Sequence, residues 1–228
     1  MLVDIFSCFD DNNLVFMSLS SLVWGFSLSL TALLVYSYWA QNTRYWVVYL
    51  SVKEVMFSQA GRTLGAQLGG FDLLIVVLFS LLVFLNLSGM VPYVFSPTSH
   101  LVFSFSMGLP FWFSLIVSGW VHNPTSAVAS LLPMGAPAPL NPFLVLIETV
   151  SISVRPITLS VRLAANMSAG HIILGLVGNY MMAASSTESM LFLVLVQVFY
   201  SMLEFAICAI QAYIFCLLLT LYSDEHTK

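Results

Sequence analysis

Long apolar runs, interrupted by a few polar positions at helical spacing, dominate this chain. Five of these runs are candidates for membrane helices, because each holds about 18 or more mostly apolar residues. They lie at 14–40, 72–90, 101–122, 142–178 and 189–222. The pattern therefore predicts an all-α polytopic membrane protein that forms a single membrane domain over residues 1–228.

The segments between the apolar runs predict two further features. Residues 42–70 mix charged and apolar positions, which is typical of an amphipathic helix on the membrane surface. They hold three of the six basic residues, so the positive-inside rule places them on the cytoplasmic or matrix face. Prolines recur through 123–141, which predicts a connecting loop and not a helix.

The last two runs are longer than one membrane crossing requires. A helix over 142–178 is roughly 55 Å long at about 1.5 Å per residue, whereas the hydrocarbon core is about 30 Å thick. It must break at Pro156 or Gly170, or lie steeply inclined. The next helix opens on a capping box at Ser185–Glu188. Two overlong helices and a short loop predict a strongly tilted hairpin.

Each of these two long helices carries a stripe of polar side chains. Positions spaced by three or four residues share one face of a helix. The first stripe consists of Glu148, Ser151, Arg155, Thr158, Arg162 and Asn166. The second consists of Gln197, Glu204 and Gln211, at heptad spacing. Both stripes predict charged or polar groups inside or close to the membrane.

Charges in this setting need an explanation, because one at the bilayer centre costs about 2.5–3.5 kcal/mol on insertion scales. One explanation is an ion pair that clamps helices together. The other is ion movement. A guanidinium stays protonated, so Arg162 cannot relay protons, whereas glutamate and histidine can exchange them. A permanent cation flanked by titratable groups suits two half-channels separated by a barrier.

Composition narrows the possible functions. The 228 residues are 60% hydrophobic and only 7% charged, which excludes an ordinary soluble domain. No basic cluster offers a nucleic-acid footprint, and no Gly-rich loop with lysine offers a nucleotide site. Three scattered cysteines fit neither a disulfide framework nor a zinc site. We therefore expect no cofactor, no metal and no nucleic-acid partner.

Four blocks of sequence resemble the subunit a family of F-type ATP synthases, the proton-channel stators of those enzymes. They are RLAANMSAGH (162–171), NLSGMVPY (86–93), LLPMGAPAPLNP (131–142) and LEFAICAIQAYIF (203–215). The resemblance extends from about residue 60 to 222. It implies a protein that is not an enzyme by itself but couples proton flow to ATP synthesis.

The resemblance also implies partners and residue roles. The partners are a rotating c-ring with one buried carboxylate per subunit, the peripheral stalk, other F0 subunits, membrane lipid and protons. Protons enter past His171 and Glu204, and leave near Glu148. Arg162 forms the barrier between the two paths, supported by Asn166 and Gln211.

Two questions stay open at this point. The proton could leave through Glu148, Asp224 or Glu225. Arg155 could screen that path or pair with Glu148, although the two lie about 10 Å apart along the axis and would touch only if the helix bends. We favour a structural role for Arg155.

A mitochondrial inner-membrane location follows from three features. Many bacterial members of the family carry an acid where His171 stands and a histidine where Glu204 stands. In addition, the N-terminal residues carry no secretory or transit signal, and the composition is rich in Leu, Phe and Met. Three rival functions remain: a haem or quinone subunit, an intramembrane protease using Ser168 and His171, and a purely structural scaffold.

Overall fold

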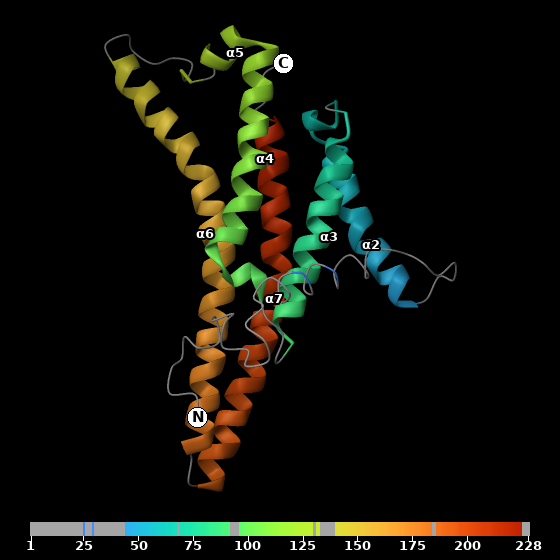
Figure 1. Cartoon of the computed structure of the whole chain (residues 1–228), viewed down its shortest axis with the longest axis vertical. Helices are drawn as coiled ribbons and strands as arrows, with labels where there is room; N and C mark the ends of the chain where they lie inside the picture. The colour runs from blue at the N-terminus through green and yellow to red at the C-terminus, as the bar shows by residue number, and fades with distance from the viewer. Residues whose placement is uncertain are drawn as a thin grey trace. The chain divides into compact units, whose positions relative to one another are not determined.

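The computed structural model describes residues 25, 29, 44–67, 69–91, 96–129, 131–132, 140–183 and 186–224. Every regular element in these ranges is a helix (Figure 1). The α-helices are α2 (Arg44–Ala60), α3 (Phe71–Gly89), α4 (Leu101–His122), α5 (Pro124–Ala129), α6 (Asn141–Ala183) and α7 (Thr187–Asp224). Two 3-10 helices, η3 (Leu64–Gln67) and η4 (Pro97–Ser99), lie between them.

Four of these helices, α3, α4, α6 and α7, are long and apolar enough to cross a membrane. The prediction of an all-α polytopic membrane protein is confirmed by this inventory. The predicted first span at 14–40 falls outside the described residues except for Gly25 and Ser29.

The helices are divided between two compact units, and each of the four long helices contributes a stretch to both. Of the residues that the structure describes, the first unit contains those in Ser80–Phe103 and Leu163–Tyr213. The second contains Asn42–Phe79, Ser104–Arg162 and the chain from Ile214 onward.

Close helix packing forms the core of the first unit. Its fully or nearly fully buried apolar side chains are Leu82, Leu85, Leu163, Ala164, Met167, Cys208 and Ala212. Gly89 lies where α3 meets this core: a Cβ there would approach the Met167 methyl carbon to 3.1 Å and the Ser96 Cβ to 2.9 Å. The packing therefore depends on a residue without a side chain at position 89.

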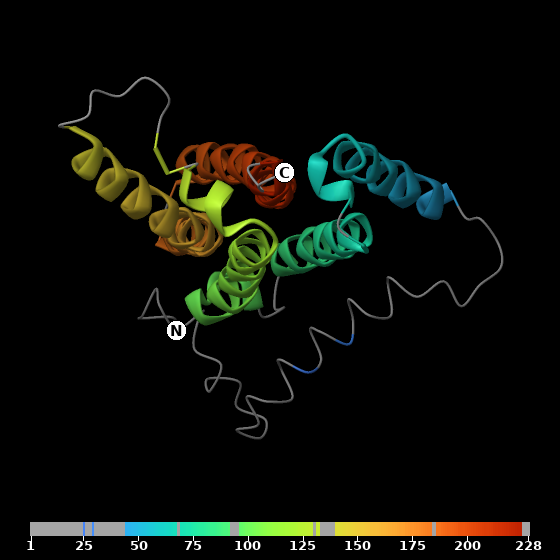
Figure 2. The ribbon, with the colours of Figure 1, turned by 90° about the horizontal axis from the view of Figure 1, so that it is seen from above.

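In the second unit, α2 lies beside α3 (Figures 1 and 2) and the segment after α2 docks on the end of α7. The backbone N–H of Leu64 donates a hydrogen bond to Asp224 Oδ1 at 2.7 Å. Gly65 leaves room for Ser223, whose Cβ would be 2.6 Å from a Cβ at position 65. The core beneath consists of Met56, Ile75, Leu159, Phe215, Cys216 and Leu219.

Helix α6 continues through both positions at which the sequence allowed a break. It runs for 43 residues, or roughly 65 Å, with Pro156 in its interior, and ends five residues beyond the expected boundary. Proline supplies no N–H, so the helix lacks the bond that residue 156 would donate to the carbonyl of Ile152. The carbonyl of Pro156 itself accepts a hydrogen bond from Ser160 Oγ at 2.9 Å. The structure thus contains the unbroken form of the helix.

The loop predicted for 123–141 is partly helical, which corrects the sequence interpretation. Residues 124–129 form α5, and the N–H of Ala127 donates to the carbonyl of Asn123 at 3.0 Å. Pro124 does not prevent this helix because proline is favoured at the first helical position, where an N–H has no intrahelical partner. Residues 133–139 are outside the described ranges.

The predicted capping box before α7 is shifted by one residue. Ser186 is the N-terminal cap: its Oγ accepts the N–H of Ser189 at 3.4 Å, and its carbonyl accepts the N–H of Met190 at 3.1 Å. Ser189, and not Glu188, therefore holds the position three residues after the cap.

The outer faces of α6 and α7 are strongly apolar. Exposed fractions reach 72% for Met202 and 91% for Met182, so these side chains need lipid or partner subunits around them. Serine and threonine hydroxyls on these two helices donate hydrogen bonds to backbone carbonyls of their own helix. Thr158 Oγ1, for example, donates to Arg155 O at 2.9 Å. Both features suit helices surrounded by hydrocarbon.

The docking of η3 on α7 predicts opposite effects for two Gly→Ala changes. Gly65→Ala should destabilise the protein by about 1–3 kcal/mol, because the new methyl group meets Ser223 and the Phe71 ring. Gly175→Ala, which meets nothing within 4 Å, should be neutral or stabilising because alanine favours a helix. Thermal unfolding in detergent measures both; equal midpoints for the two variants would contradict the close contact.

Candidate functional site

The residues of the polar stripe on α6 are half-buried at Glu148 and Arg155 and exposed at its other four positions. Arg162 and Asn166 are exposed, as are their small or β-branched neighbours Val161 and Ala165. Among the described residues, no ion pair or hydrogen bond holds the Arg162 guanidinium. A permanent cation therefore faces outward from a helix that is otherwise largely apolar.

Three contacts join α6 to α7 in the first unit. Asn166 Nδ2 donates to Gln211 Oε1 at 2.9 Å. Cys208 Sγ donates to Met167 Sδ at 3.4 Å. Gly170 faces Glu204. The contact partner on α7 moves toward lower numbers as the α6 number rises, so the two helices pair antiparallel.

Glu204 is the buried acid of this hairpin, with only 3% of its surface exposed. It fits because position 170 is glycine: a Cβ there would lie 2.6 Å from the Glu204 carboxyl carbon. Within the described part of the chain, neither carboxyl oxygen has a hydrogen-bond partner. A buried carboxyl group without such partners is costly in its ionised form, which favours a group that takes up a proton.

The other predicted residues of this unit lie close along the same helices. Gln211 is 3% exposed and so lies on the packed side of α7, as its heptad spacing from Glu204 predicts. His171 is half-buried and directly follows Gly170, the position that faces Glu204. The hairpin thus brings Asn166 into contact with Gln211. It also places His171 directly after Gly170, against which Glu204 packs.

Asn86 is a buried polar residue of this unit to which the sequence analysis assigned no role. It lies on α3, has no exposed surface, and its Nδ2 donates to the carbonyl of Cys208 at 3.3 Å. Its Oδ1 has no hydrogen-bond partner in the described ranges. One signal was available, since Asn86 is an amide inside an apolar run and opens the NLSGMVPY block.

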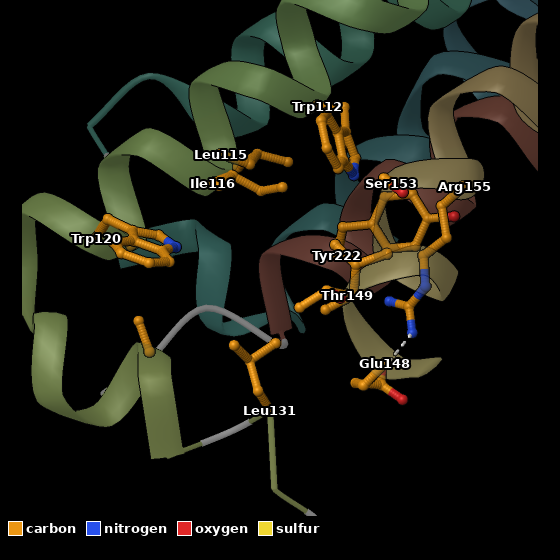
Figure 3. A pocket seen from close by; sticks show the side chains of 13 residues that line it. Trp112, Leu115, Ile116, Trp120, Leu131, Glu148, Thr149, Ser153, Arg155 and Tyr222 are labelled. Carbon is orange, nitrogen blue, oxygen red and sulfur yellow. Dashed lines mark ion pairs between the residues drawn. The ribbon is translucent and has the colours of Figure 1, made fainter. Parts of the chain in front are cut away.

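Glu148 and Arg155 form an ion pair in the second unit, with 3.8 Å between Arg155 Nη2 and Glu148 Oε1 (Figure 3). The Arg155 guanidinium also stacks over the Tyr222 ring, 5.4 Å from its centroid. The sequence interpretation allowed this contact only if the helix bends. The ion pair forms because seven residues are about two helical turns, so both side chains lie on one face of α6. Side chains on a helix tilt toward its N-terminus, which directs the long Arg155 side chain toward Glu148.

A cavity of about 470 Å³ adjoins this ion pair. Side chains of α4 and α5 form its apolar walls, and Trp112 and Trp120 are the largest of them (Figure 3). Glu148, Thr149, Ser153 and Arg155 form the polar wall on α6, and Tyr222 closes it from α7. Glu148 is therefore one of the residues that line the cavity.

Asp224 has a structural contact of its own, because it accepts the N–H of Leu64 at the start of η3. Glu225 lies outside the described residues. The buried cysteines Cys208 and Cys216 are free thiols within the helix packing. The described ranges contain no group of three or more side chains that could hold a metal ion.

Comparisons with known proteins agree over nearly the whole chain. The family model described as ATP synthase A chain matches residues 14–224. "ATP synthase subunit a" of Artemia franciscana is 38% identical over 228 residues, which cover 99% of this chain and 100% of that protein. Proteins of the same name are 38% identical in Locusta migratoria and 39% identical in Drosophila melanogaster, each over 99% of both chains.

The Asn166–Gln211 hydrogen bond predicts a measurable coupling between the two helices. In a double-variant cycle of Asn166→Leu and Gln211→Leu, the interaction free energy should be about 0.5–1.5 kcal/mol, the net value of one such bond. Unfolding in mixed micelles measures each variant. Asn179→Leu, which alters an exposed amide elsewhere on α6, should show no coupling to Gln211→Leu; a zero value for the Asn166 pair would contradict the bond.

Proposed function

The chain belongs to the ATP synthase A chain family, and from that premise we propose that it provides two offset proton half-channels beside a rotating c-ring, separated by Arg162. In this proposal, His171 and Glu204 deliver protons to the ring and Glu148 receives them on the other side. Arg162 prevents direct flow between the two.

Three statements do not depend on this proposal. The chain is a proton-translocating subunit of the F0 sector and assembles with other F0 subunits. It is a multi-pass protein of the inner mitochondrial membrane. It belongs to the membrane part of ATP synthase and not to the part that binds nucleotides.

The observation that carries the proposal is the exposed position of Arg162. A cation on the outer face of an apolar helix is expensive in lipid, so it calls for an acidic group on a neighbouring subunit. A c-ring carboxylate passing that face supplies such a group. Because a guanidinium keeps its protons, Arg162 attracts the ionised ring site but does not conduct.

Small side chains around Arg162 support a close approach by the ring. Ala165 and Ala169 are exposed on α6 and lie within two turns of Arg162. Such residues allow membrane helices to come near each other. Asn166 lies one turn from Arg162 on the same face of α6. The hydrogen bond from Asn166 to Gln211 therefore restrains the side chain of Asn166 beside Arg162.

The buried carboxyl of Glu204 suits proton delivery. Protein groups surround it on α6 and α7, yet no described residue donates a hydrogen bond to it. It is therefore stable in the protonated form, and it can take part in transfer when water or another acid reaches it. His171 next to Gly170 offers a second titratable group for the same path.

Glu148 is the exit group that the geometry supports best. It adjoins the cavity between α4, α5 and α6, whereas Asp224 is engaged with the Leu64 N–H. Glu148 is also 14 residues from Arg162, or roughly 20 Å along α6, on the side of the helix start. His171 lies beyond Arg162 in the other direction, so the two proton groups are separated by the cation along one helix.

Replacement of Arg162 tests the proposal. In inner-membrane vesicles that contain the assembled enzyme, Arg162→Ala should reduce ATP synthesis driven by an imposed proton gradient to background, and proton flow should become uncoupled or stop. The driving force is about 2.3 kcal/mol per charge per 100 mV. Arg62→Ala changes an exposed arginine on the turn after α2 and should leave synthesis unchanged. Normal synthesis with Arg162→Ala would favour the structural scaffold instead.

The Gly170–Glu204 contact gives a second prediction. Gly170→Ala places a methyl group against the Glu204 carboxyl and should displace it, which lowers proton-driven synthesis roughly tenfold or more. Gly178→Ala makes the same change on α6 with nothing within 4 Å and should retain the rate. Equal rates for the two variants, each normalised to the amount of assembled enzyme, would remove the contact from the proton path.

A further inference from the structure

The cavity beside Glu148 contains a set of contacts that the proposed function does not use. Its polar wall comes from α6, and the titratable or charged side chains that line it are Glu148, Arg155 and Tyr222. Arg155 touches both of the others: it pairs with Glu148 and stacks over Tyr222 (Figure 3). It is therefore the residue that connects the carboxylate to a second helix.

The hydroxyl groups near Glu148 are already engaged. Thr149 Oγ1 donates to Leu146 O at 2.9 Å, and Ser153 Oγ donates to Val150 O at 2.8 Å. Each hydroxyl has a single proton to donate, so neither donates to the carboxylate in this arrangement. The guanidinium of Arg155 is the group on this wall that pairs with the Glu148 carboxylate.

The ion pair by itself is too weak to fix the carboxylate. The exposed fractions are 28% for the Arg155 side chain and 40% for that of Glu148, and exposed pairs stabilise little. Stacking on Tyr222 restricts the guanidinium before it meets the carboxylate, because a cation over an aromatic face is attracted to the ring. A restrained guanidinium loses less freedom when it forms the pair.

We propose that Arg155, held by Tyr222, is a positioning residue that keeps the Glu148 carboxylate at the wall of the cavity, where it passes protons to water. This inference rests on the proposed function, which assigns proton exit to Glu148. A proton leaves the ring carboxylic acid, which becomes a carboxylate, and reaches the Glu148 carboxylate through water molecules; Glu148 then gives it to a further water molecule and is ionised again. Arg155 keeps all its protons throughout.

The alternative is that Arg155 only fills space between α6 and α7 with its aliphatic stem. Long cationic side chains do pack in this way. The two roles differ in what they require at position 155. Positioning requires a positive charge, whereas packing requires an unbranched side chain of similar length.

Two substitutions separate charge from packing. Arg155→Met keeps an unbranched apolar stem without the charge, and Arg155→Lys keeps the charge. In inner-membrane vesicles with the assembled enzyme, Arg155→Met should lower the rate of proton-driven ATP synthesis about three- to tenfold per assembled complex. Arg155→Lys, which keeps the charge but not the planar guanidinium, should give a rate between those of Arg155→Met and the unchanged protein. Arg62→Met, the same change at an exposed site outside the cavity, should retain the full rate.

Changes at Tyr222 test the second contact. Tyr222→Phe keeps the ring that Arg155 stacks on and should retain the rate, whereas Tyr222→Leu removes it and should reproduce the loss seen with Arg155→Met. Overturning results would be a rate for Arg155→Met equal to that for Arg155→Lys, or full activity of Tyr222→Leu.

Arg162→Ala and Glu148→Gln in the same vesicles distinguish failure of this inference from failure of the proposed function. If both retain normal synthesis, the half-channel proposal fails and the positioning role fails with it. If both lose synthesis while Arg155→Met remains active, only the role of Arg155 is overturned. Loss in all three, with partial rescue by Arg155→Lys, supports both.

Discussion

The cost of a polar group without a partner in apolar surroundings governs this structure. In hydrocarbon, no water replaces a missing hydrogen bond, so each polar side chain must find a protein partner or serve a function that makes its cost tolerable. On α6 and α7, hydroxyl groups return to their own helix backbone and Asn166 bonds Gln211 across the hairpin. The hydroxyl groups are satisfied within their own helices, whereas the Asn166–Gln211 bond joins the two helices and leaves Gln211 Nε2 without a hydrogen-bond partner in the described ranges.

The same rule sets apart the groups that remain. Glu204 is buried against Gly170 with no donor among the described residues, and Arg162 faces outward without an ion pair in that part of the chain. A neutral buried acid and an exposed permanent cation call for different partners. Water or another titratable group suits the first, and a passing carboxylate suits the second. A buried acid and an exposed permanent cation thus lie on the same pair of helices without sharing a residue.

Continuity of α6 has consequences for the cavity in the second unit. Because the helix does not break at Pro156, Glu148 and Arg155 stay two turns apart on one face and pair directly. Tyr222 of α7 adds a contact from a second helix. The polar wall of the cavity is therefore built on two helices, and side chains on helices are held more precisely than side chains on loops.

Hydrophobic periodicity was sufficient for the class of fold and for most of the candidate residues. Apolar runs longer than about 18 residues have few alternatives to membrane helices, and polar side chains at spacings of three and four residues must share a face. Arg162, Glu204 and Gln211 were recognisable for that reason. Local signals were less reliable at helix ends, because a proline or a serine is compatible with either side of a helix boundary. Pro124 begins α5 where a loop was predicted, and the N-terminal cap of α7 is Ser186 instead of the predicted Ser185.

Contacts between segments distant in sequence were decided by the tertiary structure alone. Composition and periodicity act within one segment, so they were enough to predict a membrane protein made of helices, with charged side chains on the two long helices of the hairpin. They did not determine that Gly170 makes room for Glu204, that Asn86 bonds the backbone of α7, or that Tyr222 supports Arg155. Each of these depends on which faces of two helices meet and at what register, and a register is a property of the packed pair and not of either helix.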